Sequence, residues 1–218
     1  MNKPKICVSI TANDLDAVRQ IEPLADLLEV RIDLIGDGWR ELAPKLSKPW
    51  IACNRTAVEG GQWQGTEDHR IEILLEAVKL GADIVDIELE TENLAAIVPM
   101  IKEKTKCLIS SHNLTGTPPI EELKKLVDCQ VETRADICKV VTTAKKFEDN
   151  LTTLDLITEC PGTRLVSFAM GPLGYISRVL SPPAGAEFTY ASIARGKESA
   201  PGQITVEELR NIYGKVNG

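Results

Sequence analysis

The sequence predicts a compact (β/α)8 (TIM) barrel, an α/β fold in which eight parallel strands alternate with helices. Eight short apolar segments, rich in Ile, Val, Leu and Cys, alternate with longer amphipathic segments along the 218 residues. The average strand–helix unit is about 27 residues long, which is near the lower limit for such a barrel. Because a helix follows each strand, the strands are expected to run parallel, with right-handed crossovers.

The main structural alternative is a doubly wound open sheet. That fold would need fewer strands and a Gly-rich turn after the first strand. The first strand here instead continues as Ser9-Ile10-Thr11-Ala12-Asn13. No low-complexity or linker-like stretch divides the chain, so residues 1–218 are expected to form one domain.

In the first half of the chain, the expected strands are short apolar runs. The run 5–10 precedes an Asn13-Asp14 capping signal, which opens a helix to about residue 26. Further strands are expected at 27–33, 50–56 and 83–89, with helices at 39–46, 66–80 and 92–104. Thr66, with His69 and Arg70 in the first turn, indicates an ordinary capped helix start.

The second half repeats the same alternation. Strands are expected at 106–112, 135–142, 164–170 and 187–192, and helices at 119–129, 146–159, 173–180 and 205–213. The pair Pro118-Pro119 suits the beginning of its helix, because proline is tolerated in the first turn.

The composition excludes several classes of protein. The net charge of −7 and the scarcity of aromatic residues, 4%, argue against a nucleic-acid partner. No apolar run approaches the roughly 18–20 residues that span a bilayer, so no membrane partner is expected. The chain has 2 His, too few for a His-rich metal centre, and no metal or cofactor is expected. The expected partner is a small molecule.

The six cysteines indicate a reducing compartment. No CxxC motif occurs, and four of the six, Cys7, Cys53, Cys107 and Cys138, lie within apolar runs. Buried free thiols are therefore expected rather than a disulfide framework, which would be unusual in a chain of this length. Residues 6–10 are too short for the core of a signal peptide, and a cytoplasmic location is expected.

Charged side chains lie late in several apolar strands, where a (β/α)8 barrel builds its active site. These residues are Glu29, Arg31 and Asp33 on the second strand, Arg55 and Glu59 after the third, Asp86 and Glu88 on the fourth, His112 on the fifth, Lys139 on the sixth, and Arg178 after the seventh. The apolar Met170 ends the seventh strand. A charge inside a strand is costly unless it is paired. A solvated outer face or an internal layer of salt bridges remains the alternative interpretation.

Taken together, these residues suggest imine chemistry. Burial in an apolar strand near several arginines would favour an unprotonated Lys139 amine, and such an amine attacks a ketone to form an imine. His112 could move protons near neutral pH, with Glu59, Asp86 or Glu88 holding its tautomer. Arginine suits bidentate binding of a carboxylate, a role open to Arg31, Arg55 and Arg178.

The chain resembles the type I 3-dehydroquinate dehydratases, the imine-forming lyases of the shikimate pathway. The matching segments follow one another in order and cover most of the chain: residues 28–33, 54–56 with 59–61, 86–89, 110–113, 138–140, 170–172 with 177–178, and 199–203. Each segment alone is weak evidence, whereas the ordered set is highly specific. Asn113-Leu114 departs from the acidic and aromatic pair of many members, and Tyr190 stands where an aromatic pocket wall is expected.

The resemblance implies dehydration of 3-dehydroquinate to 3-dehydroshikimate, the third step of the shikimate pathway to aromatic amino acids. It implies an imine on Lys139, proton transfers by His112, and orientation of His112 by Glu59 with Asp86 and Glu88 behind. The implied substrate-binding residues are Glu29, Arg31, Arg55, Arg178, Ser199, Gln203, Met170 and Ser9, of which Ser199 and Gln203 lie on a closing loop. It also implies a homodimer.

Two rival functions remain open. Another class I imine-forming barrel, such as an aldolase acting on a sugar phosphate, would need a phosphate site after the seventh and eighth strands. The loop Gly171-Pro172-Leu173-Gly174 has some of that character, although Arg178 and the 199–203 loop suit a carboxylate better. A non-catalytic binding module would not need a strand-buried lysine beside a histidine.

Overall fold

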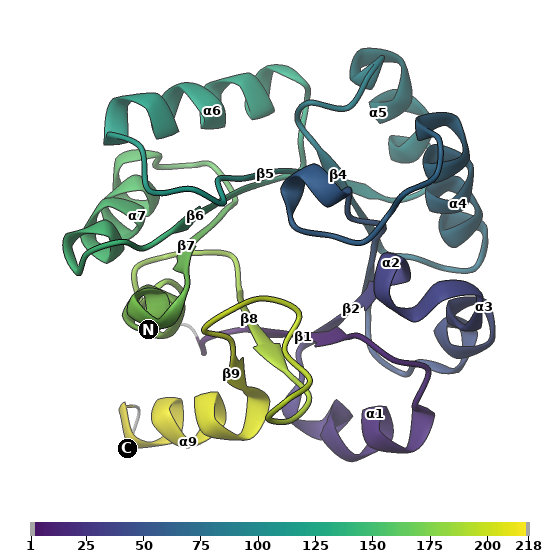
Figure 1. Ribbon diagram of the computed structural model, residues 1–218, viewed down its shortest axis with the longest axis horizontal. Helices are drawn as coiled ribbons and strands as arrows, with labels where there is room; N and C mark the ends of the chain where they lie inside the picture. The colour runs from purple at the N-terminus through teal and green to yellow at the C-terminus, as the bar shows by residue number, and fades with distance from the viewer. Residues whose placement is uncertain (1–2, 217–218) are drawn as a thin grey trace.

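The computed structural model describes residues 3–216, in which nine parallel strands form one curled sheet ringed by helices (Figure 1). The strands are β1 (Ile6–Ile10), β2 (Leu27–Arg31), β3 (Trp50–Cys53), β4 (Ile84–Glu88), β5 (Lys106–His112), β6 (Ile137–Thr143), β7 (Leu165–Met170), β8 (Thr189–Ser192) and β9 (Ile204–Thr205). The predicted (β/α)8 barrel is confirmed, and β9 is an addition that the sequence did not suggest.

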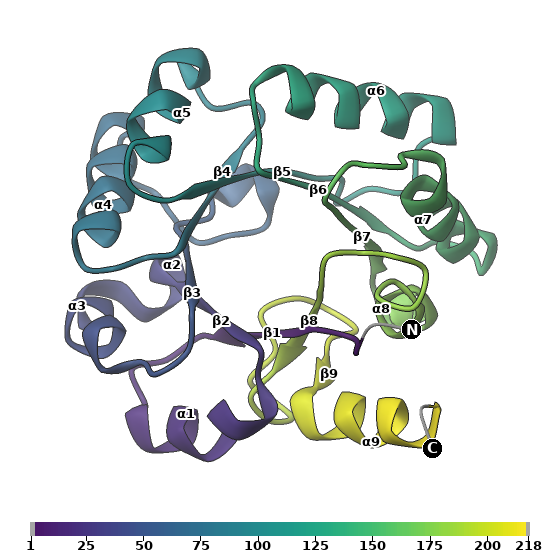
Figure 2. The ribbon, with the colours of Figure 1, turned by 180° about the vertical axis from the view of Figure 1, so that it is seen from behind.

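The helices lie on the outside of the strands, as the view from behind also shows (Figure 2). They are α1 (Leu15–Ile21), α2 (Ile32–Ile35), α3 (Trp39–Leu42), α4 (Glu67–Lys79), α5 (Leu94–Lys102), α6 (Ile120–Glu132), α7 (Glu148–Glu159), α8 (Tyr175–Leu180) and α9 (Val206–Val216). The 3-10 turns η1 (Glu22–Leu24), η2 (Gly36–Gly38), η3 (Ala43–Lys45), η4 (Ala57–Glu59) and η5 (Pro172–Gly174) complete the connections. None of the described helices has the length and apolar character that crossing a membrane requires.

The strand order is β7-β6-β5-β4-β3-β2-β1-β8-β9, so β1 pairs with both β2 and β8. Residues 3–216 show no ladder between β7 and β8. A backbone hydrogen bond from Glu187 N to Leu165 O, 2.8 Å long, crosses there. Higher in the barrel, the rings of Phe168 and Tyr190 meet edge to face, with centroids 6.1 Å apart. Side-chain packing therefore completes the closure between these two strands.

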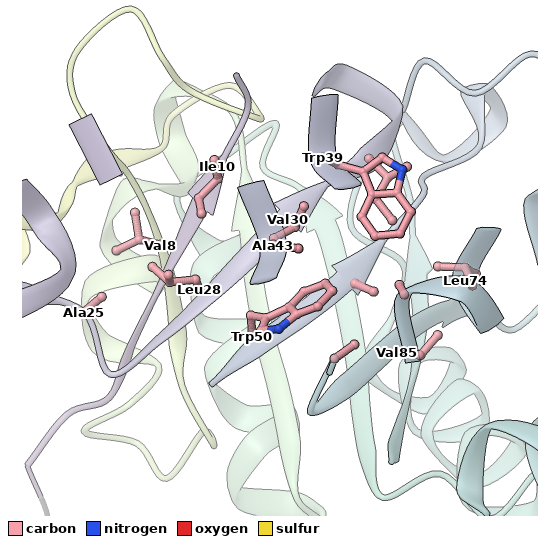
Figure 3. Packing of buried hydrophobic residues seen from close by; sticks show 14 of the residues in the cluster. Val8, Ile10, Ala25, Leu28, Val30, Trp39, Ala43, Trp50, Leu74 and Val85 are labelled. Carbon is pink, nitrogen blue, oxygen red and sulfur yellow. The ribbon is translucent and has the colours of Figure 1, made fainter. Parts of the chain in front are cut away.

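The strands present alternate residues to two apolar layers. The outer layer packs strand residues such as Val8, Leu28 and Val30 against the helices, with Trp39 and Leu74 from the helical side (Figure 3). The inner layer fills the barrel with Cys7, Leu27, Ile51, Ile84, Leu108, Ile137 and Val166. This is the period-two alternation of a strand that is buried on both faces.

The alternation also explains why charged residues point into the barrel. Moving two positions along a strand returns a side chain to the same face. Leu27 at the floor of the barrel is therefore followed on that face by Glu29, and Ile137 is followed by Lys139. Apolar residues fill the amino ends of the strands, and the polar ones collect at the carboxyl ends.

Two predicted strands end two or more residues earlier than the sequence suggested. The 27–33 run leaves the sheet after Arg31, and Ile32–Ile35 forms a helical turn. The prediction that Asp33 lies on the strand with Glu29 and Arg31 is therefore wrong. The 50–56 run ends at Cys53, so Arg55 lies in the following loop. The predicted helix caps are confirmed, since Asp14 and Thr66 each accept a backbone N–H hydrogen bond from the first turn.

Candidate active site

A cavity opens at the carboxyl ends of the strands. It is lined by Glu29, Arg31, Cys53, Arg55, His112, Lys139, Val141, Phe168, Met170, Arg178, Tyr190, Ser199, Ala200 and Gln203. Nine of the predicted site residues lie in this lining. The other four lie behind it, and each contacts one lining residue: Glu59 contacts His112, Asp86 contacts Lys139, Glu88 contacts Arg55, and Ser9 contacts Glu29. Residues from distant parts of the sequence thus meet at one end of the barrel.

Lys139 lies on β6 and is 4% exposed. Its Nζ atom is 2.9 Å from Asp86 Oδ2 and 3.7 Å from Glu29 Oε1, and it donates a hydrogen bond of 3.2 Å to the Tyr190 hydroxyl. The sequence suggested that arginines would be the nearest charges to this amine. The nearest charges are instead two carboxylates, which compensate the buried ammonium group.

Asp86 is the carboxylate that joins Lys139 to Arg55. Its Oδ1 atom lies 2.7 Å from Arg55 Nη2 and also accepts a 2.7 Å hydrogen bond from Ser110 Oγ. Burial alone would raise the pKa of Asp86, but Arg55 and Lys139 outweigh it and hold that pKa well below its usual range. Asp86 is therefore a fixed negative charge between two cations.

His112 ends β5 and faces Glu59, the last residue of η4. His112 Nδ1 lies 2.7 Å from Glu59 Oε2. Burial, Arg55 and Lys139 lower the pKa of His112 well below its usual value, so the imidazole is neutral. Burial raises the pKa of Glu59 to about 7, against the opposing effect of Arg55. Among the three carboxylates that the sequence offered as partners of His112, Glu59 is the one that contacts it.

The segment between β8 and β9 lies over the cavity and is tied down at several points. Gln203 Nε2 donates to Ser9 Oγ at 3.3 Å, and Ser9 Oγ donates to Glu29 Oε2 at 2.8 Å. Within the loop, Ser199 N and Ser199 Oγ donate to Gln203 Oε1. Ser199, Gln203, Ser9 and Glu29, predicted separately along the sequence, therefore form one hydrogen-bonded chain from the loop to β2.

Gly202 allows this loop to approach β7 closely. Its φ is +76°, and a Cβ atom built at this position would lie 2.2 Å from Gly171 O. The neighbouring carbonyl of Pro201 accepts a hydrogen bond of 3.1 Å from Gly171 N. Only glycine fits this backbone conformation and this contact.

Arg178 is a buried cation without an acidic partner among the described residues. It is 1% exposed on α8, its Nη2 donates to Pro201 O at 3.4 Å, and its guanidinium stacks over Phe168 at 4.4 Å. Its Nε atom is buried and has no hydrogen-bond partner. Burial lowers the pKa of Arg178 to about 9. A bound anion would supply the charge that this position lacks.

Arg31 is held by Asp33. Arg31 Nε and Nη2 donate to the two carboxylate oxygens of Asp33 at 2.9 Å and 2.7 Å. Although burial opposes it, this bidentate pairing raises the pKa of Arg31. Asp33 also accepts a hydrogen bond from Gln62 N at 3.0 Å, so the pair links β2 to the loop after η4.

Arg70 is a structural residue that the sequence reasoning missed. It is 1% exposed on α4 and binds Glu88 Oε2 at 2.5 Å and Glu67 through two hydrogen bonds. The other oxygen of Glu88 accepts from Arg55 Nη1 at 2.9 Å. Arg70 therefore holds the Glu88 carboxylate in the position in which it binds Arg55. A signal was available, since Arg70 occupies the apolar stripe of α4 with Ile73, Leu74 and Ala77.

One group of side chains has the spacing of a metal site. Glu29, Cys53 and Asp86 place one ligand atom each within 4.8 Å of one another. Lys139 and Arg55 already compensate the charges of Glu29 and Asp86. Burial raises the pKa of Cys53 well above its usual value, so its thiol keeps its proton and is a poor metal ligand. The donor set does not fit a resident metal ion.

The sequence is similar to known proteins along nearly its whole length. A profile of the type I 3-dehydroquinase family matches residues 6–217. The chain belongs to the type I 3-dehydroquinase family. The 3-dehydroquinate dehydratase of Dehalococcoides mccartyi is 42% identical over 216 residues, covering 99% of this chain and 97% of that protein.

Solved structures of family members have the same fold. The 3-dehydroquinate dehydratase of Geobacillus kaustophilus superimposes with a TM-score of 0.86 at 29% identity, covering 99% of this chain and 92% of that one. The type I enzyme of Clostridium difficile, with covalently modified comenic acid, gives 0.86 at 25% identity, covering 99% of this chain and 93% of that one. The family resemblance noted in the sequence is thereby confirmed.

Proposed function

We infer that this chain is a hydro-lyase that converts 3-dehydroquinate to 3-dehydroshikimate, the third step of the shikimate pathway to aromatic amino acids. Family membership supports the reaction. The observation that carries it for this chain is one cavity that holds a buried Lys139, a neutral His112 and the unpaired cation Arg178. These are a nucleophile, a base and a carboxylate-binding group.

Lys139 is proposed to form an imine with the C3 ketone of the substrate. Asp86 and Glu29 are the carboxylates nearest its Nζ atom, and the amine must lose a proton before it attacks. Once formed, the protonated imine withdraws electrons from C2 and makes the C2 proton acidic. The electron pair left on C2 by proton loss is accommodated as an enamine.

His112 is proposed to carry both proton transfers. Because Glu59 binds Nδ1, the Nε2 atom is left to take the C2 proton. The enamine then expels the C1 hydroxyl, which leaves as water with the proton from His112. Hydrolysis of the imine releases the product and restores the Lys139 amine.

The remaining residues are proposed to bind the substrate. Arg178 would pair with its carboxylate, while Glu29, Arg55 and the loop residues Ser199 and Gln203 would bind the ring hydroxyls. Met170 and Arg31 would shape the wall, and Ser9 would hold Glu29. Arg55 already binds Asp86, Glu88 and Ser110, so its larger task is to organise these acidic groups around the site.

Borohydride trapping tests the imine. Treating the protein with borohydride and 3-dehydroshikimate should add a ligand-sized mass to Lys139 and abolish the activity. Lys139→Arg is a matched control, because it keeps the positive charge beside Asp86 and cannot form the imine. Turnover is followed through the near-ultraviolet absorbance of the conjugated product. No adduct on Lys139 in an active preparation would refute the imine assignment.

Inhibitors distinguish the proposed hydro-lyase function from the rival aldolase function. A polyhydroxycyclohexane carboxylate should compete with the substrate, since Arg178 offers a carboxylate site. A sugar phosphate should not compete. If the sugar phosphate protects Lys139 from borohydride trapping better than the carboxylate does, the aldolase function is favoured instead.

We propose that the protein associates as a homodimer through its α7–α8 face. Large apolar side chains are exposed there, namely Phe147, Leu151, Leu173, Tyr175, Ile176 and Leu180. An exposed patch of this kind is typical of an association surface. Light scattering should give twice the mass of the chain, and Leu151→Glu together with Ile176→Glu should reduce it to that of a monomer.

A cytoplasmic location is also proposed. All six cysteines are free, and Cys7, Cys53, Cys107 and Cys138 are buried, as had been predicted. Unpaired thiols in such number suit a reducing compartment. Subcellular fractionation with an antibody to the protein would test this proposal.

A further inference from the structure

The Tyr190 hydroxyl lies directly on the amine that the proposed function uses as its nucleophile. Tyr190 is on β8 and is 4% exposed. Lys139 Nζ donates to its hydroxyl at 3.2 Å and lies 4.4 Å from the centre of its ring. The ring is set edge to face against Phe188, 5.4 Å away, and against Phe168. The hydroxyl is therefore held in place by packing on both sides.

This hydroxyl differs chemically from the other neighbours of Lys139. Asp86 and Glu29 are the charged groups near Nζ, and an ionised carboxylate only accepts hydrogen bonds. A phenol both accepts and donates. It can accept from the ammonium group and, in the same position, donate to an oxygen atom beside it. Burial, followed by the nearby Glu29, raises the pKa of Tyr190 well above its usual value, so the phenol keeps its proton.

We propose that the Tyr190 hydroxyl is a further catalytic group, which orients the Lys139 amine and donates a hydrogen bond to the oxygen that leaves during imine formation. The inference rests on the proposed imine function and extends it to a residue whose ring alone was expected to matter. The oxygen concerned is bonded to the same carbon as Nζ, so a donor that contacts Nζ is also close to that oxygen.

The bond changes balance without consuming the phenol proton. The Lys139 amine adds to the ketone carbon, and the carbonyl π electrons move to oxygen, which takes one proton from the nitrogen. His112 takes up the proton that the Lys139 amine loses before it attacks, and it returns this proton to that hydroxyl, which becomes water. The nitrogen lone pair then forms the C=N bond as the C–O bond breaks. Tyr190 donates a hydrogen bond to this oxygen throughout and remains a neutral phenol.

Tyr190→Phe is the test, because it removes the hydroxyl and keeps the ring packed between Phe168 and Phe188. Enzyme in excess over 3-dehydroshikimate is mixed rapidly, and borohydride is added at timed intervals. The mass of the adduct on Lys139 then gives the rate of imine formation. We expect this rate to fall about 10- to 100-fold, the effect of losing one hydrogen bond to a charged group. The affinity for a competitive carboxylate inhibitor should be unchanged.

Tyr213→Phe is the matched control. Tyr213 is also a buried tyrosine, and its hydroxyl donates to Val179 O at 2.9 Å, away from the cavity. This variant should form the adduct at the wild-type rate. A general loss of packing would slow both variants and weaken inhibitor binding, and that result would overturn the proposal.

The outcome also distinguishes this inference from the proposed function. If the wild-type protein forms an adduct on Lys139 and Tyr190→Phe forms it at the same rate, the role of the hydroxyl is refuted while the imine mechanism stands. If the wild-type protein forms no adduct, the imine mechanism is refuted, and the role of Tyr190 with it.

Discussion

Glu59 Oε2 and His112 Nδ1 lie 2.7 Å apart, although 53 residues separate them along the chain. One residue comes from the turn after β3 and the other from the end of β5. The contact decides which ring nitrogen of His112 faces the cavity. It also joins a carboxyl group whose pKa is raised to a histidine whose pKa is lowered.

This pair predicts the pH dependence of catalysis. The pKa of Glu59 is raised to about 7, so the carboxylate gains a proton as the pH falls through neutrality. His112 then loses the acceptor of its Nδ1–H, and kcat/KM should decline below about pH 7. The lowered pKa of His112 keeps the ring itself neutral over this range. Glu59→Gln should give low activity without this acidic limb, and an unchanged limb in that variant would contradict the assignment.

Removing the base should slow turnover severely. His112→Ala deletes the group proposed to move both protons, and kcat should fall about 10²- to 10⁴-fold. The matched control is His69→Ala, because the His69 side chain is exposed on α4 and pairs with Glu72 at the surface. Steady-state kinetics on both variants tests this prediction. Near wild-type turnover by His112→Ala would show that another group is the base.

Arg178 should lower the stability of the folded protein and strengthen the binding of the substrate. It is buried without an acidic partner in residues 3–216, so Arg178→Met should stabilise the folded protein by about 1–4 kcal/mol. The same change should lower kcat/KM about 10²-fold or more, because the substrate carboxylate loses its cation. Thermal unfolding and kinetics measure the two effects. Arg164→Met, which removes a half-exposed pair with Glu187, should alter stability by less than about 1 kcal/mol.

Arg70 should matter to stability more than its place in an ordinary helix suggested. Arg70→Ala leaves the buried Glu88 carboxylate with Arg55 as its remaining ion-pair partner, and should cost about 3–5 kcal/mol. Denaturant unfolding measures this difference. Arg40→Ala removes the more exposed pair with Glu76 and should cost less than about 1 kcal/mol. Equal costs for the two variants would show that the buried network adds nothing.

Chelation should leave the reaction unchanged. Glu29, Cys53 and Asp86 have the spacing of metal ligands, but Lys139 and Arg55 already compensate their charges. Dialysis against EDTA is therefore expected to preserve full activity. Recovery of lost activity by added Zn²⁺ or Mg²⁺ would contradict this prediction.

The sequence predicted the strands well where each is a continuous apolar run. The 106–112 strand has the predicted bounds, and residues 107–110 at its centre are buried without interruption. The 27–33 strand was predicted too long, since a helical turn after Arg31 preserves the same hydrophobic pattern. The two-residue β9 was missed, because so short a strand has no periodicity of its own.

The predicted site residues were found together, but several of their partners were not the ones expected. Lys139 was expected beside arginines and lies beside Asp86 and Glu29. Arg70 was noted only as part of the first turn of a capped helix, and it is buried against Glu88. Such pairings join residues 18 and 53 positions apart, as for Arg70–Glu88 and Lys139–Asp86. Local patterns do not contain them.

The sequence by itself determined the alternation of strands and helices, and the face of each strand that carries charge. Both follow from short-range physics, because side chains alternate along a strand and apolar ones must be buried. The tertiary structure alone decided which charges meet. Strand register and barrel curvature bring Asp86 to Lys139, Glu59 to His112 and the Tyr190 hydroxyl to the amine. Against the effect of burial, Arg55 and Lys139 lower the pKa of Asp86, and burial together with these two cations lowers the pKa of His112.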